Sequence, residues 1–346
     1  MGARTATVPG KSHAAKGRRA DVNPSDIPVG VVGLGLMGRS IAACLLAAGH
    51  PVAGVEIDPA KRRSVKRHVV SLLREMKSEG LLKADPSEVI NHFSVSDDFS
   101  ALTTSEVVVE SIIENIAAKR RVIRKVEEVV SATAILGSNT SAIPVTQLQE
   151  GALHPERILG IHWAEPAHVT RFMEIICGQH TEARCAERVL TLARGWGKEP
   201  SLLRRDIRGF ITNRIMYAML REAFYLVESG YATIADVDRS LRNDLGYWIT
   251  FAGPFRYMDL TGVPAYAEVM RDLFPDLSRS TRVPPLISDL VKSGARGVSN
   301  SRGFYRYTRA QAKRWGKLFL KFSYEIRALA QRYPEDVGDG PESSSK

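Results

Sequence analysis

A histidine and a glutamate lie on two short apolar segments that are typical of β-strands. His162 lies near the end of segment 158–163, and Glu174 lies within segment 172–177. If the two strands are neighbours, the carboxylate can contact the imidazole, fix its tautomer and stabilise the charged ring after it accepts a proton. The two residues are therefore a candidate general base and its orienting partner. A buried histidine paired with a glutamate for structural reasons is the alternative interpretation.

Two further polar residues lie where they can hold a reacting oxygen. Ser141 follows a predicted strand, near the carboxyl edge of the predicted sheet, which is where ligands bind in parallel α/β folds. Asn213 lies in the first turn of a long predicted helix, from which its amide can face the same cleft. Both have structural alternatives, because Ser141 can cap the turn before Pro144 and Asn213 can bind local backbone.

A glycine-rich turn between the first predicted strand and the first predicted helix is typical of a dinucleotide site. Its first glycine permits a tight turn, its second lets the backbone approach a pyrophosphate, and its third allows close packing of helix on strand. The N-terminus of the helix offers free N–H groups and the positive end of its dipole to the phosphates. The residues expected to contact the cofactor in this turn are Gly33, Gly35, Leu36, Met37 and Gly38.

An acidic residue at the end of the second predicted strand bears on the choice of cofactor. Glu56 can accept hydrogen bonds from both hydroxyls of a ribose, and its charge would repel a 2′-phosphate. This favours NAD over NADP. Arg62 and Arg63 follow closely and leave the choice open, although a solvated helix face is the preferred interpretation of both arginines.

Strand-like and helix-like segments alternate up to Asp206, which predicts an α/β fold with a doubly wound parallel sheet of the Rossmann type. Beyond this residue the pattern becomes helical, and it begins with a long amphipathic helix over 209–230. We expect a disordered tail over 1–26, an NAD-binding domain over 27–206, an all-α domain over 207–333 and a disordered tail over 334–346. Strands are expected over 29–33, 52–57, 107–113, 134–136, 158–163 and 172–177, and helices of the first domain over 37–48, 59–79, 86–91 and 118–130.

The composition is that of an ordinary globular protein, with 346 residues, 44% of them hydrophobic and 25% charged. The chain has no apolar run of the roughly 18 residues that a membrane-spanning helix needs. Part of the net charge of +10 comes from the N-terminal tail, where basic residues between Arg4 and Arg19 have no acidic neighbours. The remaining positive charge favours an acidic ligand such as a phosphorylated cofactor. Aromatic residues do not alternate with a basic stripe, so a nucleic-acid partner is not expected.

The cysteines and the N-terminal segment bear on the cellular compartment. Cys44, Cys177 and Cys185 have no metal-ligand spacing, and we expect them to be small core residues in a reducing compartment. The N-terminal segment has no apolar stretch typical of a secretory signal, although a transit peptide is an alternative. We expect a cytoplasmic protein that acts on a small molecule, with neither a metal ion nor a membrane partner.

Taken together, these motifs resemble the L-3-hydroxyacyl-CoA dehydrogenase family over about residues 28–308. The helical stretch 59–79 is similar to the helical arm with which that family shields an acyl-CoA. Beside the glycine-rich turn, the matching segments are Glu110-Ser-Ile-Ile-Glu114-Asn115, Asn139-Thr-Ser141, His162 with Pro166, Met173-Glu174, Gly209-Phe-Ile-Thr-Asn213-Arg214, Gly253-Pro-Phe255 with Asp259-Leu260, and Gly303-Phe-Tyr305.

The resemblance implies the reversible oxidation of a 3-hydroxyacyl-CoA to a 3-oxoacyl-CoA, with NAD as the hydride acceptor. His162 then takes the hydroxyl proton, and Glu174 orients and balances it. Ser141 and Asn213 are expected to hold the reacting oxygen and the neighbouring carbonyl. The all-α domain is where the family forms homodimers, so a homodimer is expected.

The resemblance also implies two cofactor contacts after the central strands. Glu110 and Asn139 are expected near the cofactor, with Glu110 towards its nicotinamide end. A core carboxylate with all its partners inside the protein is the alternative for Glu110. Lys119 is interpreted as part of a solvated helix face, and His168 as a loop residue.

The chain departs from the family shortly after the histidine. Glu165 is an acid where the family usually has an amide, and Arg171, where the family is usually apolar, can neutralise it. This departure leaves the substrate open. The alternatives are a free 3-hydroxy acid of the carnitine or gulonate type, and a non-catalytic NAD-binding protein. An additional basic helix over 310–332 is expected to pack on the core or on a partner subunit.

Overall fold

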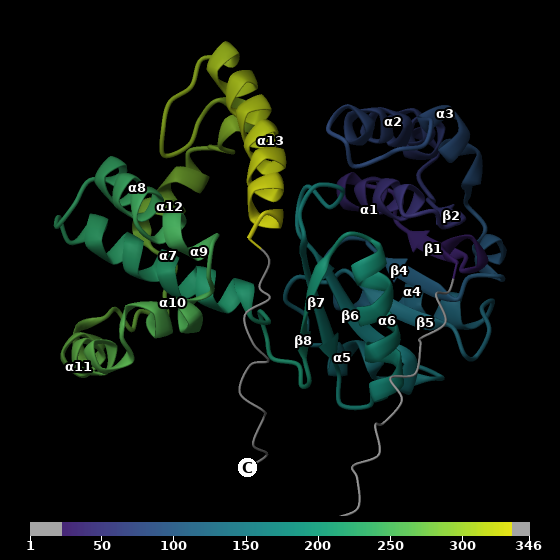
Figure 1. Ribbon diagram of the computed structural model, residues 1–346, viewed down its shortest axis with the longest axis horizontal. Helices are drawn as coiled ribbons and strands as arrows, with labels where there is room; N and C mark the ends of the chain where they lie inside the picture. The colour runs from purple at the N-terminus through teal and green to yellow at the C-terminus, as the bar shows by residue number, and fades with distance from the viewer. Residues whose placement is uncertain (1–22, 334–346) are drawn as a thin grey trace, which may run out of the picture.

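The computed structural model describes residues 23–333, so residues 1–22 and 334–346 of the two predicted tails lie outside the described range. Figure 1 shows an α/β domain and a helical domain that lie beside each other. The part of the predicted N-terminal tail that is described includes a short 3-10 turn, Pro24–Asp26.

The α/β domain contains an eight-stranded sheet in the order β3-β2-β1-β4-β5-β6-β7-β8. Paired strands are parallel except β6 and β7, which run antiparallel. The order reverses between β1 and β4, which is the predicted doubly wound arrangement and confirms the predicted fold class. The strands are β1 Val29–Val32, β2 Val52–Val55, β3 Phe93–Ser96, β4 Val107–Glu110, β5 Ile135–Ser138, β6 Ile158–Trp163, β7 Phe172–Cys177 and β8 Glu199–Leu203.

Apolar cores form on both faces of this sheet, because successive side chains of a strand point to opposite faces. On β4, Val107 and Val109 join one core, and Val108 joins the other. The predicted placement of the three cysteines is confirmed, since all are buried and unpaired. The helices of this domain are α1 Leu36–Ala47, α2 Pro59–Ser78, α3 Pro86–Val89, α4 Ile116–Glu127, α5 Val145–Gln149 and α6 Ala183–Gly195.

The first helix of the helical domain begins at Thr212, three residues later than the helix predicted over 209–230. Gly209 and Phe210 have φ angles of 83° and 53°, and this left-handed backbone cannot continue a right-handed helix. Helix α7 therefore starts at Thr212. The helices here are α7 Thr212–Glu228, α8 Ile234–Asn243, α9 Leu245–Ile249, α10 Pro254–Thr261, α11 Val263–Leu273, α12 Pro285–Lys292 and α13 Arg309–Gln331.

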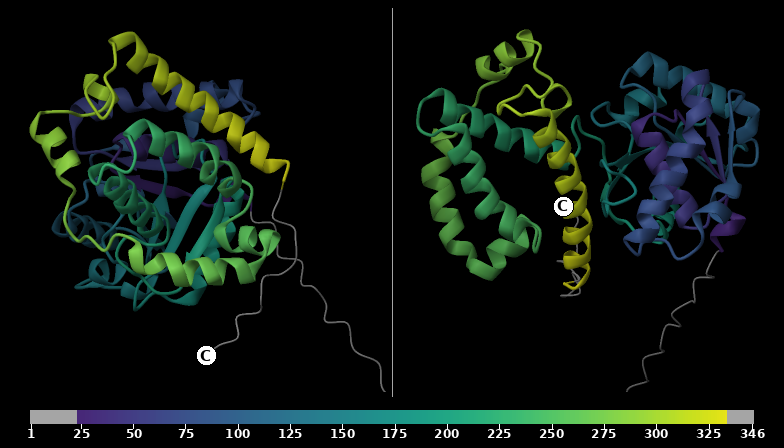
Figure 2. Two further views of the ribbon diagram at one scale, coloured as in Figure 1. Left: turned by 90° about the vertical axis from the view of Figure 1, so that its left-hand side faces the viewer. Right: turned by 90° about the horizontal axis from the view of Figure 1, so that it is seen from above.

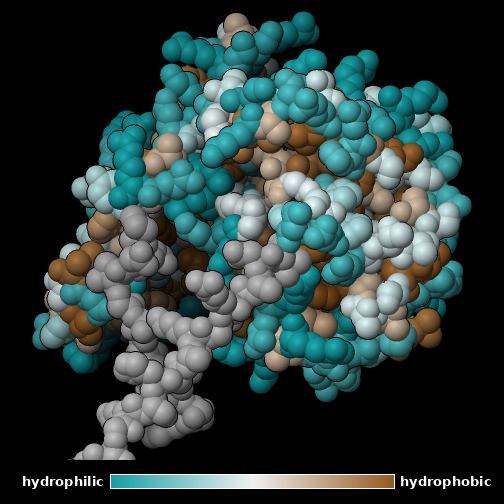
Figure 3. All heavy atoms as spheres, turned by 45° about the vertical axis from the view of Figure 1, so that its right-hand side comes forward, coloured by the Kyte–Doolittle hydropathy of each residue, from teal (hydrophilic) through white to brown (hydrophobic). Residues whose placement is uncertain are grey.

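The helical domain has little core of its own. Helices α7 to α12 contain no buried residue. Figure 3 shows apolar side chains on the molecular surface among polar ones. The last helix, α13, stands between the other helices of this domain and the α/β domain in Figure 1 and in the right-hand view of Figure 2. Within residues 23–333, no helix is long and apolar enough to cross a membrane.

Candidate active site

The predicted histidine–glutamate pair is present, on adjacent antiparallel strands. His162 on β6 lies directly opposite Glu174 on β7 in the strand register. The His162 Nδ1 and Glu174 Oε2 atoms are 2.8 Å apart, and both residues are buried. The rings of Phe172 and Phe210 contact the imidazole edge-on, with centroids 5.4 and 5.5 Å away. Because Glu174 occupies Nδ1, the other ring nitrogen, Nε2, is the one available to a substrate.

Glu174 also holds the start of the helical domain. Its Oε1 atom accepts hydrogen bonds from the backbone N–H groups of Ile211, at 3.1 Å, and Thr212, at 2.9 Å. Burial alone would raise the pKa of this carboxyl group. The hydrogen bonds from His162 and from the start of α7 outweigh burial and hold the pKa of Glu174 below its usual value. The carboxylate is therefore charged, and it binds the imidazole and the N-terminus of α7 at once.

Ser141 and Asn213 meet through the serine backbone, and their predicted contacts with a substrate stay a prediction. The Asn213 Nδ2 atom donates a hydrogen bond to the Ser141 carbonyl oxygen at 2.8 Å, which joins the two domains. The Ser141 side chain is exposed, and its hydroxyl has no protein partner among the described residues. This hydroxyl is therefore free to bind a ligand.

Glu114 shapes the loop that carries Ser141, a role that sequence reasoning did not assign. Its Oε1 atom accepts hydrogen bonds from the Thr140 hydroxyl at 2.6 Å and from the N–H groups of Ser141 and Ala142 at 3.0 and 3.1 Å. Burial would raise the pKa of Glu114. The hydrogen bonds to Oε1 and the charge of Lys119 instead place that pKa below its usual value.

Our interpretation of Lys119 as part of a solvated helix face is wrong. The side chain is fully buried, and its Nζ lies 2.8 Å from Glu110 Oε1 and 3.5 Å from Glu114 Oε2. A buried cation needs such carboxylate partners, because burial without them is very unfavourable. The only advance signal was the pair of acids at Glu110 and Glu114, nine and five residues before the lysine on α4.

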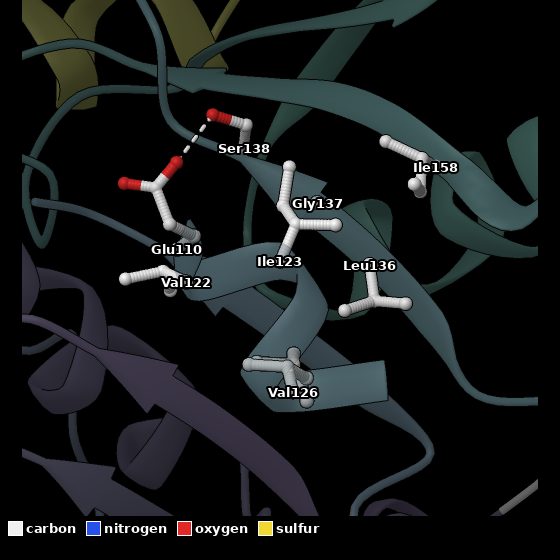
Figure 4. Close-up of a pocket in the computed structure, with 9 residues that line it drawn as sticks. Glu110, Val122, Ile123, Val126, Leu136, Gly137, Ser138 and Ile158 are labelled. Atoms are coloured by element: carbon white, nitrogen blue, oxygen red, sulfur yellow. Dashed lines mark hydrogen bonds between the residues drawn. The ribbon is translucent and has the colours of Figure 1, made fainter. Parts of the chain in front are cut away.

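Glu110 has all its contacts inside the protein. Besides Lys119, its carboxylate accepts hydrogen bonds from the Ile112 N–H at 2.7 Å and from the Ser138 hydroxyl at 2.6 Å. Figure 4 shows this carboxylate at the edge of a small apolar space between α4 and the strands of the sheet, pointing towards Ser138. These are the contacts of a core carboxylate. The expected proximity of Glu110 to a nicotinamide stays a prediction.

Asn139 connects three strands. Its backbone N–H binds the Glu110 carbonyl at 2.7 Å, its Nδ2 lies 3.2 Å from the Ser111 hydroxyl, and its Oδ1 accepts from the Trp163 N–H at 2.9 Å. The side chain thereby ties the ends of β4 and β5 to the end of β6, directly after His162. Its predicted contact with the cofactor is not tested by these bonds.

The glycine-rich turn has the geometry that a pyrophosphate needs. Gly33 has a φ of 88°, and a Cβ atom on Gly38 would lie 1.8 Å from the Gly33 carbonyl oxygen. By contrast, a Cβ on Gly35 would meet no atom within 4 Å, so this backbone faces open space. Gly35 precedes α1, whose first residues are Leu36 and Met37. The turn thus presents an accessible helix N-terminus of the kind that binds phosphates.

Glu56 lies beside this turn, at the end of β2. Its Oε2 accepts from the Leu34 N–H at 2.9 Å, and its Oε1 accepts from the Asp58 N–H at 3.0 Å. Each carboxylate oxygen can accept a further hydrogen bond, so the group remains able to bind ribose hydroxyls. Arg62 is not on a free solvated face, because it pairs with Asp97 at 2.8 Å and donates to the Glu56 carbonyl. The positive charge of Arg62 is therefore already paired inside the protein and is not available to a 2′-phosphate. This arrangement fits NAD.

The residues after His162 differ in part from expectation. Glu165 is exposed, and Arg171 does not neutralise it, because Arg171 pairs with Glu199. His168 lies in the loop as predicted but is buried, with Nδ1 2.8 Å from the Ser40 hydroxyl and Nε2 2.9 Å from Glu75 Oε1. Burial lowers the pKa of His168 despite the nearby Glu75 carboxylate.

Family models match most of the chain. The NAD-binding domain of 3-hydroxyacyl-CoA dehydrogenase matches residues 28–207, and the C-terminal domain of 3-hydroxyacyl-CoA dehydrogenase matches residues 209–307. The helix α13 lies beyond the end of the second match.

Similar sequences come from two kinds of enzyme. A 5-formyl-3-hydroxy-2-methylpyridine 4-carboxylate 5-dehydrogenase of Mesorhizobium japonicum is 32% identical over 82% of this chain and 92% of its own. A probable 3-hydroxybutyryl-CoA dehydrogenase of Bacillus subtilis is 31% identical over 80% of this chain and 96% of its own.

Solved structures of the same two kinds are similar in fold. The crystal structure of an NAD-dependent 5-formyl-3-hydroxy-2-methylpyridine 4-carboxylic acid 5-dehydrogenase has a TM-score of 0.82 and 29% identity, over 89% of this chain and 99% of that one. An (S)-3-hydroxybutyryl-CoA dehydrogenase from Ralstonia eutropha has a TM-score of 0.68 and 28% identity, over 81% of this chain and 99% of that one. With both family domains matched, and with the glycine-rich turn and the His162–Glu174 pair in place, the chain belongs to the 3-hydroxyacyl-CoA dehydrogenase family of NAD-dependent oxidoreductases.

Proposed function

We propose that this protein oxidises a hydroxyl-bearing carbon of a small free acid, with His162 as the general base. NAD, when bound, accepts the hydride from that carbon. The Nε2 atom of His162 takes the hydroxyl proton, so that the oxygen keeps the electron pair of the O–H bond and forms the carbonyl. Glu174 holds the opposite ring nitrogen at 2.8 Å and stabilises the imidazolium that results.

Ser141 and Asn213 complete the proposed site from two sides. The free hydroxyl of Ser141 can donate a hydrogen bond to the reacting oxygen, which carries developing negative charge in the reverse direction. Asn213 crosses from α7 to the Ser141 carbonyl and keeps both residues in one place. Neither contact depends on the rest of the substrate, so this part of the proposal is the same for every substrate of the family.

The fit of one solved structure supports a free acid as the substrate. The dehydrogenase named for a pyridine carboxylate has a TM-score of 0.82 with this chain, against 0.68 for the 3-hydroxybutyryl-CoA dehydrogenase. By its name, the former enzyme acts on a carboxylate without CoA. The Mesorhizobium japonicum enzyme of the same name is 32% identical in sequence to this chain.

A 3-hydroxyacyl-CoA is the second candidate, and the charge of α2 favours it. Four exposed basic side chains on α2, Arg63, Lys66, Arg67 and Arg74, have no ion-pair partner among the described residues. Phosphate groups of CoA need such cations. The 3-hydroxybutyryl-CoA dehydrogenases among the relatives are named for such a substrate.

A substrate panel with NAD separates the two candidates. We expect kcat/KM for at least one free acid, among the pyridine carboxylate, 3-hydroxybutyrate, carnitine and gulonate, to exceed that for 3-hydroxybutyryl-CoA at least roughly tenfold, a difference of about 1.4 kcal/mol. NADH absorbance measures each rate. Turnover confined to the CoA thioester would contradict the free-acid proposal. Tight NADH binding without turnover of any substrate would contradict both and point to a non-catalytic NAD-binding protein.

We also propose that the protein is a homodimer formed through the helical domain. Large apolar side chains on this domain are exposed, among them Tyr217 at 64%, Tyr247 at 78% and Phe255 at 79%. A helical unit without a core of its own needs another surface to bury such side chains. Helices α9, α10 and α13 also line an apolar groove of about 1410 Å³, which includes Trp248, Phe251 and Phe319. A second copy, with matching apolar helices, is the occupant that these surfaces fit.

Analytical ultracentrifugation tests the dimer. At micromolar concentration, the expected mass is twice the 38.1 kDa of the chain. Replacing Phe319 with Asp, within the groove, should shift the protein towards the monomer, because a buried unpaired charge is unfavourable. Exposed Lys317 on the same helix provides the control position. A wild-type protein that sediments only as a 38.1 kDa monomer would refute the proposal.

A further inference from the structure

The final helix, α13, contacts the α/β domain although it belongs to the helical domain. It begins at Arg309, after the family match ends at residue 307. In the right-hand view of Figure 2 it stands between the remaining helices of its domain and the α/β domain. Most residues of α13 are exposed or half-buried, and the two buried ones are Ala312 and Tyr324. The second of these makes one of the contacts between the domains.

Two side chains of α13 bind the α/β domain through polar groups. The Tyr324 hydroxyl donates to Glu75 Oε1 on α2 at 2.8 Å. One turn later, the Arg327 guanidinium donates to the Val169 carbonyl at 2.6 Å and to the Gly197 carbonyl at 3.1 Å. Glu75 Oε1 is also the partner of His168 Nε2, at 2.9 Å. Both contacts of α13 therefore reach the loop 164–171, one directly and one through Glu75.

This loop joins the two strands that carry the catalytic pair. It follows β6, which holds His162, and it precedes Phe172 on β7, whose ring contacts the imidazole at a centroid distance of 5.4 Å. Two cations bind its carbonyl groups: Lys198 binds those of Ala167 and Thr170 at 2.5 Å, and Arg327 binds that of Val169. The first cation belongs to the α/β domain, whereas the second comes from α13. The position of the loop therefore depends on the helical domain.

We propose that Arg327 and Tyr324 are positioning residues, and that α13 is a clamp that holds the helical domain against the loop 164–171. The catalytic roles of His162 and Asn213 in this inference rest on the proposed function. At one end of the helical domain, Asn213 binds the Ser141 carbonyl. At the other end, Arg327 and Tyr324 bind the loop after His162. The clamp thereby fixes the helical domain at two places and keeps Asn213 in reach of the site.

Loss of the clamp should reduce turnover more strongly than it weakens cofactor binding. The contact of Arg327 with the Val169 carbonyl lies on the loop after His162, whereas the glycine-rich turn and Glu56 lie at β1 and β2. We expect Arg327→Met, which keeps most of the side-chain length but removes the donors, to lower kcat roughly tenfold while the KM for NAD stays within about twofold. Misplacement of reacting groups by a fraction of an ångström is enough for such a loss. Tyr324→Phe, which removes only a hydroxyl and preserves packing, should lower kcat by a smaller factor.

Hydrogen exchange tests the clamp without a substrate. The N–H groups of Val169 and Thr170 both bind the Pro166 carbonyl, at 3.0 Å, and report on the order of the loop. In full-length protein with NADH, Arg327→Met should speed their exchange, with a smaller effect from Tyr324→Phe. The control is Lys317→Met on the same helix, since Lys317 is exposed and does not line the apolar groove. This variant should leave exchange and kcat unchanged.

The outcomes separate this inference from the proposed function. Unchanged exchange at Val169 and Thr170 in both Arg327→Met and Tyr324→Phe overturns the clamp, whatever the substrate is. Faster exchange with unaltered kcat overturns the positioning role. A wild-type protein that oxidises no substrate of the panel contradicts the proposed function, whereas the exchange data still decide whether α13 holds the loop.

Discussion

Replacing His162 with Gln is expected to lower kcat by about three orders of magnitude while NADH still binds. A positioned general base contributes about 10²- to 10⁴-fold to a proton transfer, and Gln cannot accept the proton. The Gln side chain can still contact Glu174, so the strands β6 and β7 should remain paired. The substrate is the one preferred in the panel, and kcat is followed by NADH absorbance. NADH affinity comes from fluorescence titration.

The control for this variant is His180→Gln. The His180 side chain is exposed, and within residues 23–333 the residue forms a hydrogen bond only through its backbone N–H, to Gln149. Its kcat should equal that of the wild type. A His162→Gln enzyme within tenfold of wild-type kcat would contradict the role of His162 as the base. A loss of NADH affinity comparable to the loss of kcat would instead place the defect in the fold of the domain.

Two glycines of one turn should respond in opposite ways to the same substitution. Gly38→Ala places a methyl group 1.8 Å from the Gly33 carbonyl oxygen, so that α1 or β1 must move. We expect a loss of about 3 kcal/mol in the free energy of unfolding, at the upper end of the usual cost of overpacking. Gly35→Ala meets no atom within 4 Å, and it should change that free energy by about 1 kcal/mol or less.

The same pair distinguishes folding from cofactor binding. The methyl group of Gly35→Ala occupies the space through which a pyrophosphate would approach the helix, so its affinity for NADH should fall at least roughly tenfold. Urea unfolding gives the stability of each variant, and fluorescence titration gives the NADH affinity. A Gly38→Ala protein of wild-type stability would contradict the close packing of Gly38 on Gly33. A Gly35→Ala protein with wild-type affinity would show that the turn does not bind the pyrophosphate as inferred.

The strands that carry the proposed catalytic pair, His162 and Glu174, could be predicted from local pattern alone. The segments 158–163 and 172–177 are β6 and β7, with the same ends as predicted. They are apolar runs buried almost throughout, so their limits coincide with a sharp change in polarity. The contact between His162 and Glu174 was also predicted, because two neighbouring strands bring such residues together. The antiparallel pairing itself could not be read from either segment.

Other features depend on contacts between distant parts of the chain. Lys119 was misjudged because a lysine on a helix is usually exposed, and only the fold shows that Glu110 and Glu114 enclose it. The strand β8 was not predicted, because a glutamate and a proline at its start, Glu199 and Pro200, are typical of a loop. Proline is tolerated there because β8 is an edge strand that pairs only with β7 in the described sheet. The bonds from Ile211 and Thr212 to Glu174 could not be foreseen either, since they require the two domains to be in place.

Those two bonds bear on how parts of this enzyme can be exchanged with those of relatives. A boundary drawn between residues 207 and 209, where the two family matches meet, separates Glu174 from the amides that it binds. A chimaera cut there would combine a charged carboxylate from one parent with the first turn of α7 from another. The smallest unit that can be transplanted without disturbing His162, the proposed proton acceptor, therefore extends through Asn213. The α/β domain and the helical domain therefore share the first turn of α7, and any recombination of the two domains has to keep that turn with Glu174.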